Sequence, residues 1–296
     1  MPQILLLKLA GEISLKSKPV QNRFYATLLN NIRTALRNNS ITDFEVKRGY
    51  GRIFLSCQDP EKTISVLKSV FGLHSIAIAK KYENAIPKNI YSKTLTFARI
   101  KLKRGDSFAV RCNRVGNHGY SSQQINQGAG EKILKEINEL KVNLKNPDKE
   151  IFIEIRNDDF YLYSSESNGY NGLPVGVEGH VGILCNNKEE DLLAALCMLK
   201  RGCSIYCIIK EPVDEHFFDP IVKFNSYQKI KFFEFDSIKN TDPQKQKMVA
   251  LVDPSMELDL KRIAGQDKDM FLPVFRPLLF MPEDKISELR RMIYND

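Results

Sequence analysis

The chain has 296 residues, which is long enough for two or three domains that each bury a core, and its composition excludes a disordered protein. It contains no run of 18 apolar residues, and residues 1–10 lack a cleavage-site pattern, which argues against membrane segments and secretion signals and predicts a cytoplasmic protein. The net charge of +8 divides unevenly: residues 1–176 carry 27 Lys plus Arg against 16 Asp plus Glu (+11), and residues 177–296 carry 17 against 20 (−3). A basic half of this kind indicates either a polyanion partner such as RNA or a solvated basic face.

The first 85 residues alternate strand-like and helix-like segments. Strands are expected at residues 4–9, 44–47, 52–56 and 75–82, and amphipathic helices at residues 20–37 and 60–70. Gly49 and Gly51 permit the positive φ of a tight turn between the second and third strands. This order predicts a small α+β domain of the split β-α-β type, with its helices on one face of the sheet.

A second domain is expected at residues 86–172. The pattern predicts a helix at residues 89–102, a strand at 108–112, a helix at 121–140 and a hairpin formed by 151–155 and 160–163. Ser121 or Ser122 is the expected N-cap of the second helix. Residues 164–182 are rich in Ser, Asn and Gly, which indicates a domain boundary near residue 172.

The remaining residues, 173–296, follow a different pattern. Strands are expected at residues 181–185, 204–209, 248–252 and 272–275, and helices at residues 189–200 and 283–294. Alternation of strands with helices is typical of a doubly wound parallel sheet. The predicted fold class is therefore multidomain, with two α+β domains followed by a Rossmann-like α/β domain.

Six cysteines are scattered among apolar neighbours, and none forms the C-x-x-C spacing of a metal or redox pair. Cys203 and Cys207 stand four residues apart in a predicted strand. We interpret both as small buried core residues, the alternative being a thiol pair. No metal site is expected.

Three blocks of residues carry a family resemblance. The first is GEISLK at 11–16 followed by Arg23-Phe24; the second is FAVRCNR at 108–114 with GLPVG at 172–176; the third surrounds residues 186–191 and ends in Arg276-Pro277-Leu278. They resemble, in this order, the ferredoxin-like, THUMP and PP-loop ATPase domains of the ThiI family, the tRNA 4-thiouridine synthetases. The resemblance does not include the rhodanese-like extension of that family, and we expect none in this chain.

The resemblance and the charge together predict tRNA, or another structured RNA, as the partner. In this family the THUMP domain engages the acceptor end of tRNA, and a strand that carries arginines beside aromatic rings offers contacts for phosphates and unpaired bases. The expected RNA-binding residues are Lys16, Lys101, Lys103, Arg104, Arg111, Arg114, His118 and Tyr120. Two alternatives remain, because Arg111 could pair with a buried carboxylate and residues 101–104 could form a solvated turn.

The third block departs from its family at the phosphate loop. Where the family has S-G-G-x-D-S, this chain has NNKEED at residues 186–191. Asn187 can adopt positive φ, but Lys188 places a Cβ where the backbone must approach a phosphate closely. Acids in the first helical turn also take the charge position that a phosphate would fill. A degenerate nucleotide site is therefore predicted, with Asn186, Asn187, Lys188, Asp191 and Arg276 as its remaining candidate residues.

These features favour a non-catalytic tRNA-binding protein that presents tRNA to a separate modifying enzyme and needs no cofactor. The alternative is a tRNA 4-thiouridine synthetase that uses ATP with Mg²⁺ to adenylate a uridine for sulfur transfer. A third interpretation is an assembly subunit that docks a partner through the acidic residues 211–219, with Phe217 and Phe218 exposed. The sequence gives no oligomeric state.

Overall fold

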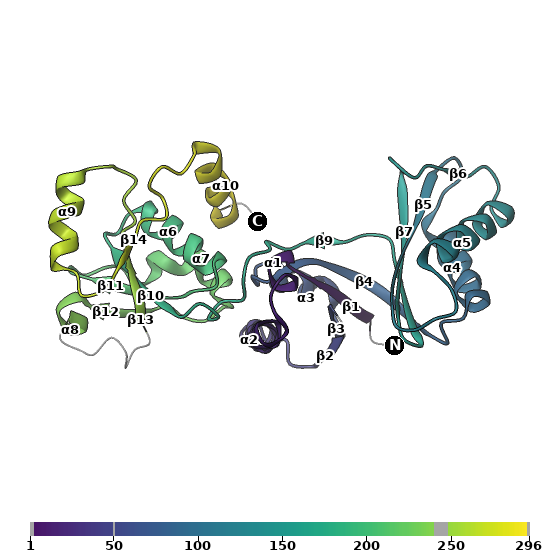
Figure 1. The fold of residues 1–296 in the computed structure, drawn as a ribbon, viewed down its shortest axis with the longest axis horizontal. Helices are drawn as coiled ribbons and strands as arrows, with labels where there is room; N and C mark the ends of the chain where they lie inside the picture. The colour runs from purple at the N-terminus through teal and green to yellow at the C-terminus, as the bar shows by residue number, and fades with distance from the viewer. Residues whose placement is uncertain (1–2, 50, 240–247, 295–296) are drawn as a thin grey trace. The chain divides into compact units, whose positions relative to one another are not determined.

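The structure is a computed structural model that describes residues 3–49, 51–239 and 248–294 (Figure 1). The chain forms two compact units, and each gathers segments that are distant in the sequence. The sheet unit comprises residues 1–8, 43–64 and 75–168, and the α/β unit comprises residues 9–42, 65–74 and 169–296. Within the described ranges, no helix is both long and apolar enough to cross a membrane.

One twisted sheet forms the framework of the sheet unit. Its strands are ordered β2-β3-β1-β4-β8-β7-β5-β6, and β9 pairs with β4. They span β1 (Gln3–Leu9), β2 (Phe44–Gly49), β3 (Arg52–Cys57), β4 (Leu73–Glu83), β5 (Ser107–Val115), β6 (Lys141–Val142), β7 (Lys149–Arg156), β8 (Asp159–Tyr163) and β9 (Ser167–Asn168). Strand β4 pairs antiparallel with β8, and Lys80 lies opposite Leu162. The strands of the first two predicted domains therefore form one continuous sheet.

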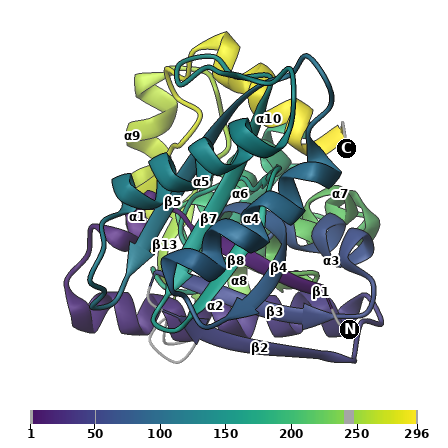
Figure 2. The ribbon, with the colours of Figure 1, turned by 90° about the vertical axis from the view of Figure 1, so that its right-hand side faces the viewer.

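Two helices, α4 (Pro87–Lys101) and α5 (Ser122–Glu136), lie side by side against the part of this sheet formed by β5, β7 and β8 (Figure 2). Ile90 of α4 and Ile125 of α5 are fully buried and share a core with Ile151 and Ile155 of β7. The predicted N-cap is confirmed, because the Ser121 hydroxyl accepts from the Gln124 backbone N–H at 3.1 Å. The helix ends at Glu136, four residues before its predicted end.

A five-stranded parallel sheet in the order β12-β11-β10-β13-β14 organises the α/β unit, which confirms the predicted parallel α/β fold. Its strands are β10 (His180–Cys185), β11 (Ser204–Ile209), β12 (Lys231–Glu234), β13 (Met248–Val252) and β14 (Val274–Phe275). Its helices are α1 (Gly11–Ser14), α2 (Lys18–Asn38), α6 (Glu189–Lys200), η1 (Glu215–Phe218), α7 (Asp219–Val222), η2 (Lys223–Asn225), α8 (Phe235–Lys239), α9 (Leu260–Asp269) and α10 (Glu283–Tyr294). Helix α3 (Pro60–Leu67) runs from one unit into the other and ends three residues before its predicted end.

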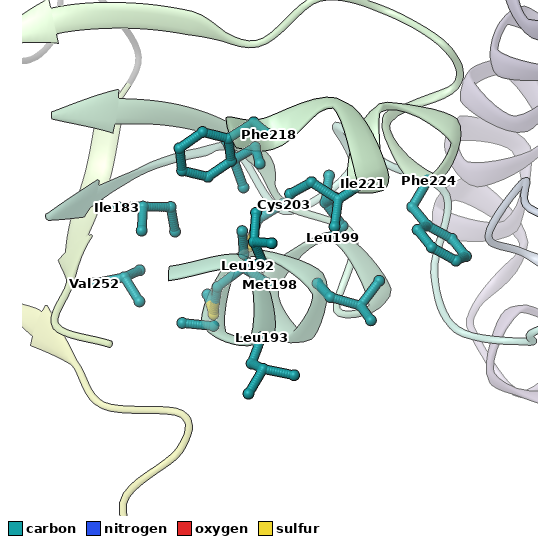
Figure 3. Close-up of a cluster of buried hydrophobic side chains, with 14 of the residues drawn as sticks. Ile183, Leu192, Leu193, Met198, Leu199, Cys203, Phe218, Ile221, Phe224 and Val252 are labelled. Atoms are coloured by element: carbon teal, nitrogen blue, oxygen red, sulfur yellow. The ribbon is translucent and has the colours of Figure 1, made fainter. Parts of the chain in front are cut away.

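Helix α6 forms the centre of the core of the α/β unit (Figure 3). Its apolar side chains meet Ile183 of β10, Val252 of β13 and the aromatic rings of the 215–225 segment. The interpretation of Phe218 as an exposed docking residue is wrong, because only 1% of its surface is exposed. The hydrophobic effect accounts for this burial, since the acids beside it remain in solvent while the ring completes the core.

Helix α2 belongs to the α/β unit although it precedes that unit's sheet by about 140 residues. The buried Asn31 of α2 donates to the Val175 carbonyl at 3.0 Å. Phe71, from the same half of the sequence as α2, stacks on Phe224 with ring centroids 5.5 Å apart. N-terminal residues therefore complete the core of the C-terminal sheet.

Candidate functional site

The loop at residues 186–191, which the sequence predicts to be a degenerate phosphate loop, connects β10 to α6. Asn187 adopts φ +60°, the left-handed conformation that glycine usually supplies in a tight loop. Asp191, in the first turn of α6, is fully buried. Its Oδ2 accepts from the backbone N–H of Asn186 at 2.8 Å and of Lys188 at 3.3 Å. Two amides of the loop thus already bind a carboxylate of the chain itself.

Burial raises the pKa of Asp191, and hydrogen bonds from the loop backbone oppose this rise. Desolvation disfavours the charged carboxylate, whereas N–H donors favour it. Asp191 Oδ1 is buried and has no hydrogen-bond partner in the part of the chain that the structure describes. Glu189, another acid of this helical turn, forms an ion pair with Arg290 of α10 at 3.0 Å.

Arg276 follows β14, the edge strand of the same sheet. Its guanidinium binds Asp253 at 3.2 Å and Asp267 at 2.5 Å, and 12% of the side chain is exposed. Hydrogen bonding to Asp267, followed by the charges of both acids, raises the pKa of Arg276. Asn186, Asp253 and Arg276 follow adjacent parallel strands at their carboxyl ends, where sheets of this type bind ligands.

The sheet unit brings three predicted RNA-binding residues together at the carboxyl end of β5. Arg114 Nη1 lies 3.2 Å from His118 Nδ1 and 3.1 Å from the Gly116 carbonyl oxygen. The rings of His118 and Tyr120 have centroids 5.1 Å apart, and the Tyr120 hydroxyl donates to the Ala85 carbonyl. Strand β5 continues past its predicted end at residue 112 through Val115 by pairing with β7, so Arg114 belongs to the strand.

Two other predicted arginines have carboxylate partners. Arg111 Nε binds Glu150 at 2.9 Å, and its Nη2 donates to the Leu144 carbonyl at 2.6 Å. Glu150 is partly exposed, so it is not the buried carboxylate that was one of the alternatives for Arg111. Arg104 forms two hydrogen bonds to Glu139. Both guanidiniums therefore support the sheet unit in addition to any contact with RNA.

Lys16, Lys101 and Lys103 are exposed, and none of them forms an ion pair with another described residue. Lys16 lies in the turn between α1 and α2 of the α/β unit. Lys101 ends α4, with its Nζ 6.0 Å from the centroid of the Phe97 ring, and Lys103 follows in the turn before β5. Residues 101–104 therefore form a solvated turn, which was one of the alternatives, and Lys101 and Lys103 in this turn are still accessible to a phosphate.

Sequence reasoning missed further cations on the helices that cover the sheet. Lys88 and Lys93 of α4 and Lys135 of α5 are exposed. Their positions opposite the buried stripe of each helix could have been read from the helical period. These lysines enlarge the basic surface beyond the candidates named from the family resemblance.

The cysteines behave as core residues. Cys203 and Cys207 are buried and free, which confirms their interpretation as small packing residues. Burial raises the pKa of Cys203 to about 11 and also raises that of Cys207. A nucleophilic thiol needs access and a lowered pKa, and neither cysteine has these properties.

Two family models match the chain. The ThiI ferredoxin-like domain matches residues 4–77, and the THUMP domain matches residues 86–165. A probable tRNA sulfurtransferase of Saccharolobus islandicus is 36% identical over 202 residues, which cover 67% of this chain and 52% of that relative. The chain spans about half the length of the curated relatives that it matches.

Two solved structures share the fold. The protein PH1313 of Pyrococcus horikoshii Ot3 superimposes with a TM-score of 0.85 and 26% identity over 98% of both chains. A 4-thiouridine synthetase, solved as an RNA complex with bound ATP, superimposes with a TM-score of 0.74 and 20% identity, covering 99% of this chain and 85% of that one. The second likeness is one of fold alone.

Proposed function

Because the chain is a ThiI-like THUMP protein of the tRNA-modification family, we propose that it binds tRNA and presents it to a separate modifying enzyme without activating the tRNA itself. The basic first half supplies the attraction to the tRNA backbone. The exposed lysines of the turn between α4 and β5 supply direct contacts to phosphates. The cluster of Arg114, His118 and Tyr120 orders the adjacent strand end and the start of α5.

The observation that carries the non-catalytic part of this proposal is the position of Asp191. A phosphate loop binds its ligand with successive backbone N–H groups at a helix N-terminus. Here the N–H groups of Asn186 and Lys188 donate to the Asp191 carboxylate, and Arg276 is held between two acids. This arrangement does not fit a nucleotide phosphate, so no reaction step through ATP is assigned to this loop.

A salt titration of tRNA binding tests the RNA half of the proposal. The association constant should fall steeply as salt rises, with a slope of roughly −0.9 for each duplex phosphate neutralised. Fluorescence anisotropy with labelled tRNA at five or six salt concentrations gives this slope. A slope near zero, or no binding at low salt, would remove the proposal.

The curated relatives support a second candidate function, because they are named tRNA sulfurtransferases. That function requires adenylation of a tRNA uridine, which releases pyrophosphate before sulfur is transferred and AMP leaves. The decisive assay incubates the protein with ATP, Mg²⁺, tRNA and a sulfur donor, with a control that lacks tRNA. We expect no tRNA-dependent AMP, and its appearance would establish the enzyme instead.

A further inference from the structure

The α/β unit contains a cavity of about 330 Å³ at the edge of the sheet opposite the phosphate loop. It lies where the parallel strands begin, at His180 of β10, Ser204 of β11 and Lys231 of β12. Helix α2 contributes Asn30 and Thr27 to its wall. The cavity is therefore separate from the loop at residues 186–191, which follows the carboxyl end of β10.

The lining of this cavity is cationic. Lys229 and Lys231 are both exposed and lie on its wall, and no carboxylate belongs to the described lining. This contrasts with residues 177–296 as a whole, where 17 Lys plus Arg are outnumbered by 20 Asp plus Glu. A cavity that is lined by two lysines, in a part of the chain that is otherwise acidic, indicates an anionic ligand.

The other lining groups suit a planar heterocycle with hydrogen-bonding edges. The Tyr206 and His180 rings stack with centroids 4.9 Å apart, and both line the cavity. The amides of Asn30 and Gln228 and the hydroxyl of Ser204 offer donors and acceptors. Aromatic faces and amides are the groups with which proteins bind unpaired bases.

The loop beside the lysines has an unusual backbone. Ser226 and Tyr227 adopt φ +54° and +57° in succession, a conformation that residues other than glycine rarely adopt. The side-chain amide of Asn38 in α2 donates to the Tyr227 carbonyl at 2.8 Å and fixes this turn. Such local strain clusters at ligand sites. The turn places Asn225 and Gln228, its flanking residues, on the cavity wall.

We infer that this cavity binds a single nucleotide, with its phosphate at Lys229 and Lys231 and its base near Tyr206 and the amides. The volume lies at the lower end of the range of about 300–1,000 Å³ found for small-molecule sites, which favours one nucleotide over a longer ligand. The nucleotide is either a free nucleoside monophosphate or one unpaired residue of an RNA. This inference does not depend on the proposed tRNA-presenting function.

The test titrates the full chain by calorimetry, without Mg²⁺ and without tRNA. The probes are the four nucleoside 5′-monophosphates, inorganic phosphate and an unstructured RNA tetranucleotide. A combined Lys229→Gln and Lys231→Gln variant removes the cations, and a combined Lys261→Gln and Lys268→Gln variant, at two exposed lysines of α9, is the matched control. Circular dichroism and thermal melting verify that the variants are folded.

We expect one nucleotide to bind per chain, with affinity reduced at least tenfold in the double variant and unchanged in the control. Binding of a monophosphate identifies a free nucleotide as the ligand, whereas binding of the tetranucleotide alone identifies a residue of RNA. The inference is overturned if neither binds, or if the double variant binds as the wild type does. Equal affinity for inorganic phosphate would also overturn it, because the base would then contribute nothing.

Discussion

The carboxylate of Asp191 accepts hydrogen bonds from two backbone N–H groups of the loop that precedes α6. The sequence shows that residues 186–191 lack the glycines of the family motif, and it allows the left-handed conformation that Asn187 adopts. It does not indicate which of the three acids turns inward, because each suits the helix dipole equally. The structure selects Asp191, since its position in the first turn allows it to accept from the Asn186 and Lys188 amides.

The raised pKa of Asp191 predicts a specific dependence of stability on pH. The folded chain retains this proton at pH values at which an unfolded chain, with an ordinary pKa of 3.8, has lost it. Asp191 therefore makes stability fall as pH rises through the window between the two pKa values. Asp191→Asn does not titrate, so its free energy of unfolding should increase relative to wild type from pH 3.5 to pH 7, measured in urea.

A second variant at this position provides the control for that measurement. Asp191→Ala removes the acceptor from two buried N–H groups and should cost about 1–3 kcal/mol of stability at all pH values, because each donor loses its partner. Asn retains one acceptor oxygen and should be tolerated better. A stability difference between wild type and Asp191→Asn that does not vary with pH would contradict the assigned protonation.

At the scale of the elements, local patterns predicted most of the fold. The observed bounds of β11, α6, β13 and α10 coincide with those expected from apolar periodicity. Strand β5 is longer than predicted because Arg114 and Val115 pair with Ile155 and Arg156 of β7, some 40 residues later. Such pairing depends on register between distant segments, so the partners of Arg111 and Arg114 could not be derived from the sequence.

The turn between α4 and β5 yields a prediction about RNA binding. Lys101 and Lys103 form no ion pair with described residues, whereas Arg104 in the same turn binds Glu139. Replacing both lysines by Gln should weaken tRNA binding and reduce the slope of log K against log salt by about 2, since each lost phosphate contact lowers it by about 1. Anisotropy titrations measure both quantities.

The matched control replaces Lys261 and Lys268 of α9, two exposed lysines in the acidic half of the chain, by Gln. It changes the net charge by the same amount but should leave the slope unchanged. Arg104→Gln should have a smaller effect than the combined Lys101 and Lys103 variant, because its charge is already compensated by Glu139. If the α9 control lowered the slope as much as the turn variant, general charge rather than the turn would govern binding.

At the scale of the whole molecule, the order of the segments in the sequence does not indicate which of them fold into the same unit. The hydrogen bond from Asn31 to Val175 places α2 in the α/β unit, although its period alone predicted a helix of the first domain. The cavity at Lys229 and Lys231 could not be predicted for the same reason, since its wall combines α2 with the starts of β10 and β11. The net charge of a segment, in contrast, is the sum of the charges of its residues, so the basic first half of the chain can be identified from the sequence alone.

The charge asymmetry predicts where tRNA protects the protein from hydrogen exchange. Polyanion binding follows local charge, and the balance is +11 for residues 1–176 but −3 for residues 177–296. Amides of the 101–107 turn and of the start of α5 should therefore exchange more slowly with tRNA present, whereas α9 and α10 should keep their rates. Mass spectrometry at low salt measures this, and raising the salt until the complex dissociates should abolish the protection. Protection centred on α9 and α10 would instead assign RNA binding to the acidic half, and the role given to the basic turn would be wrong.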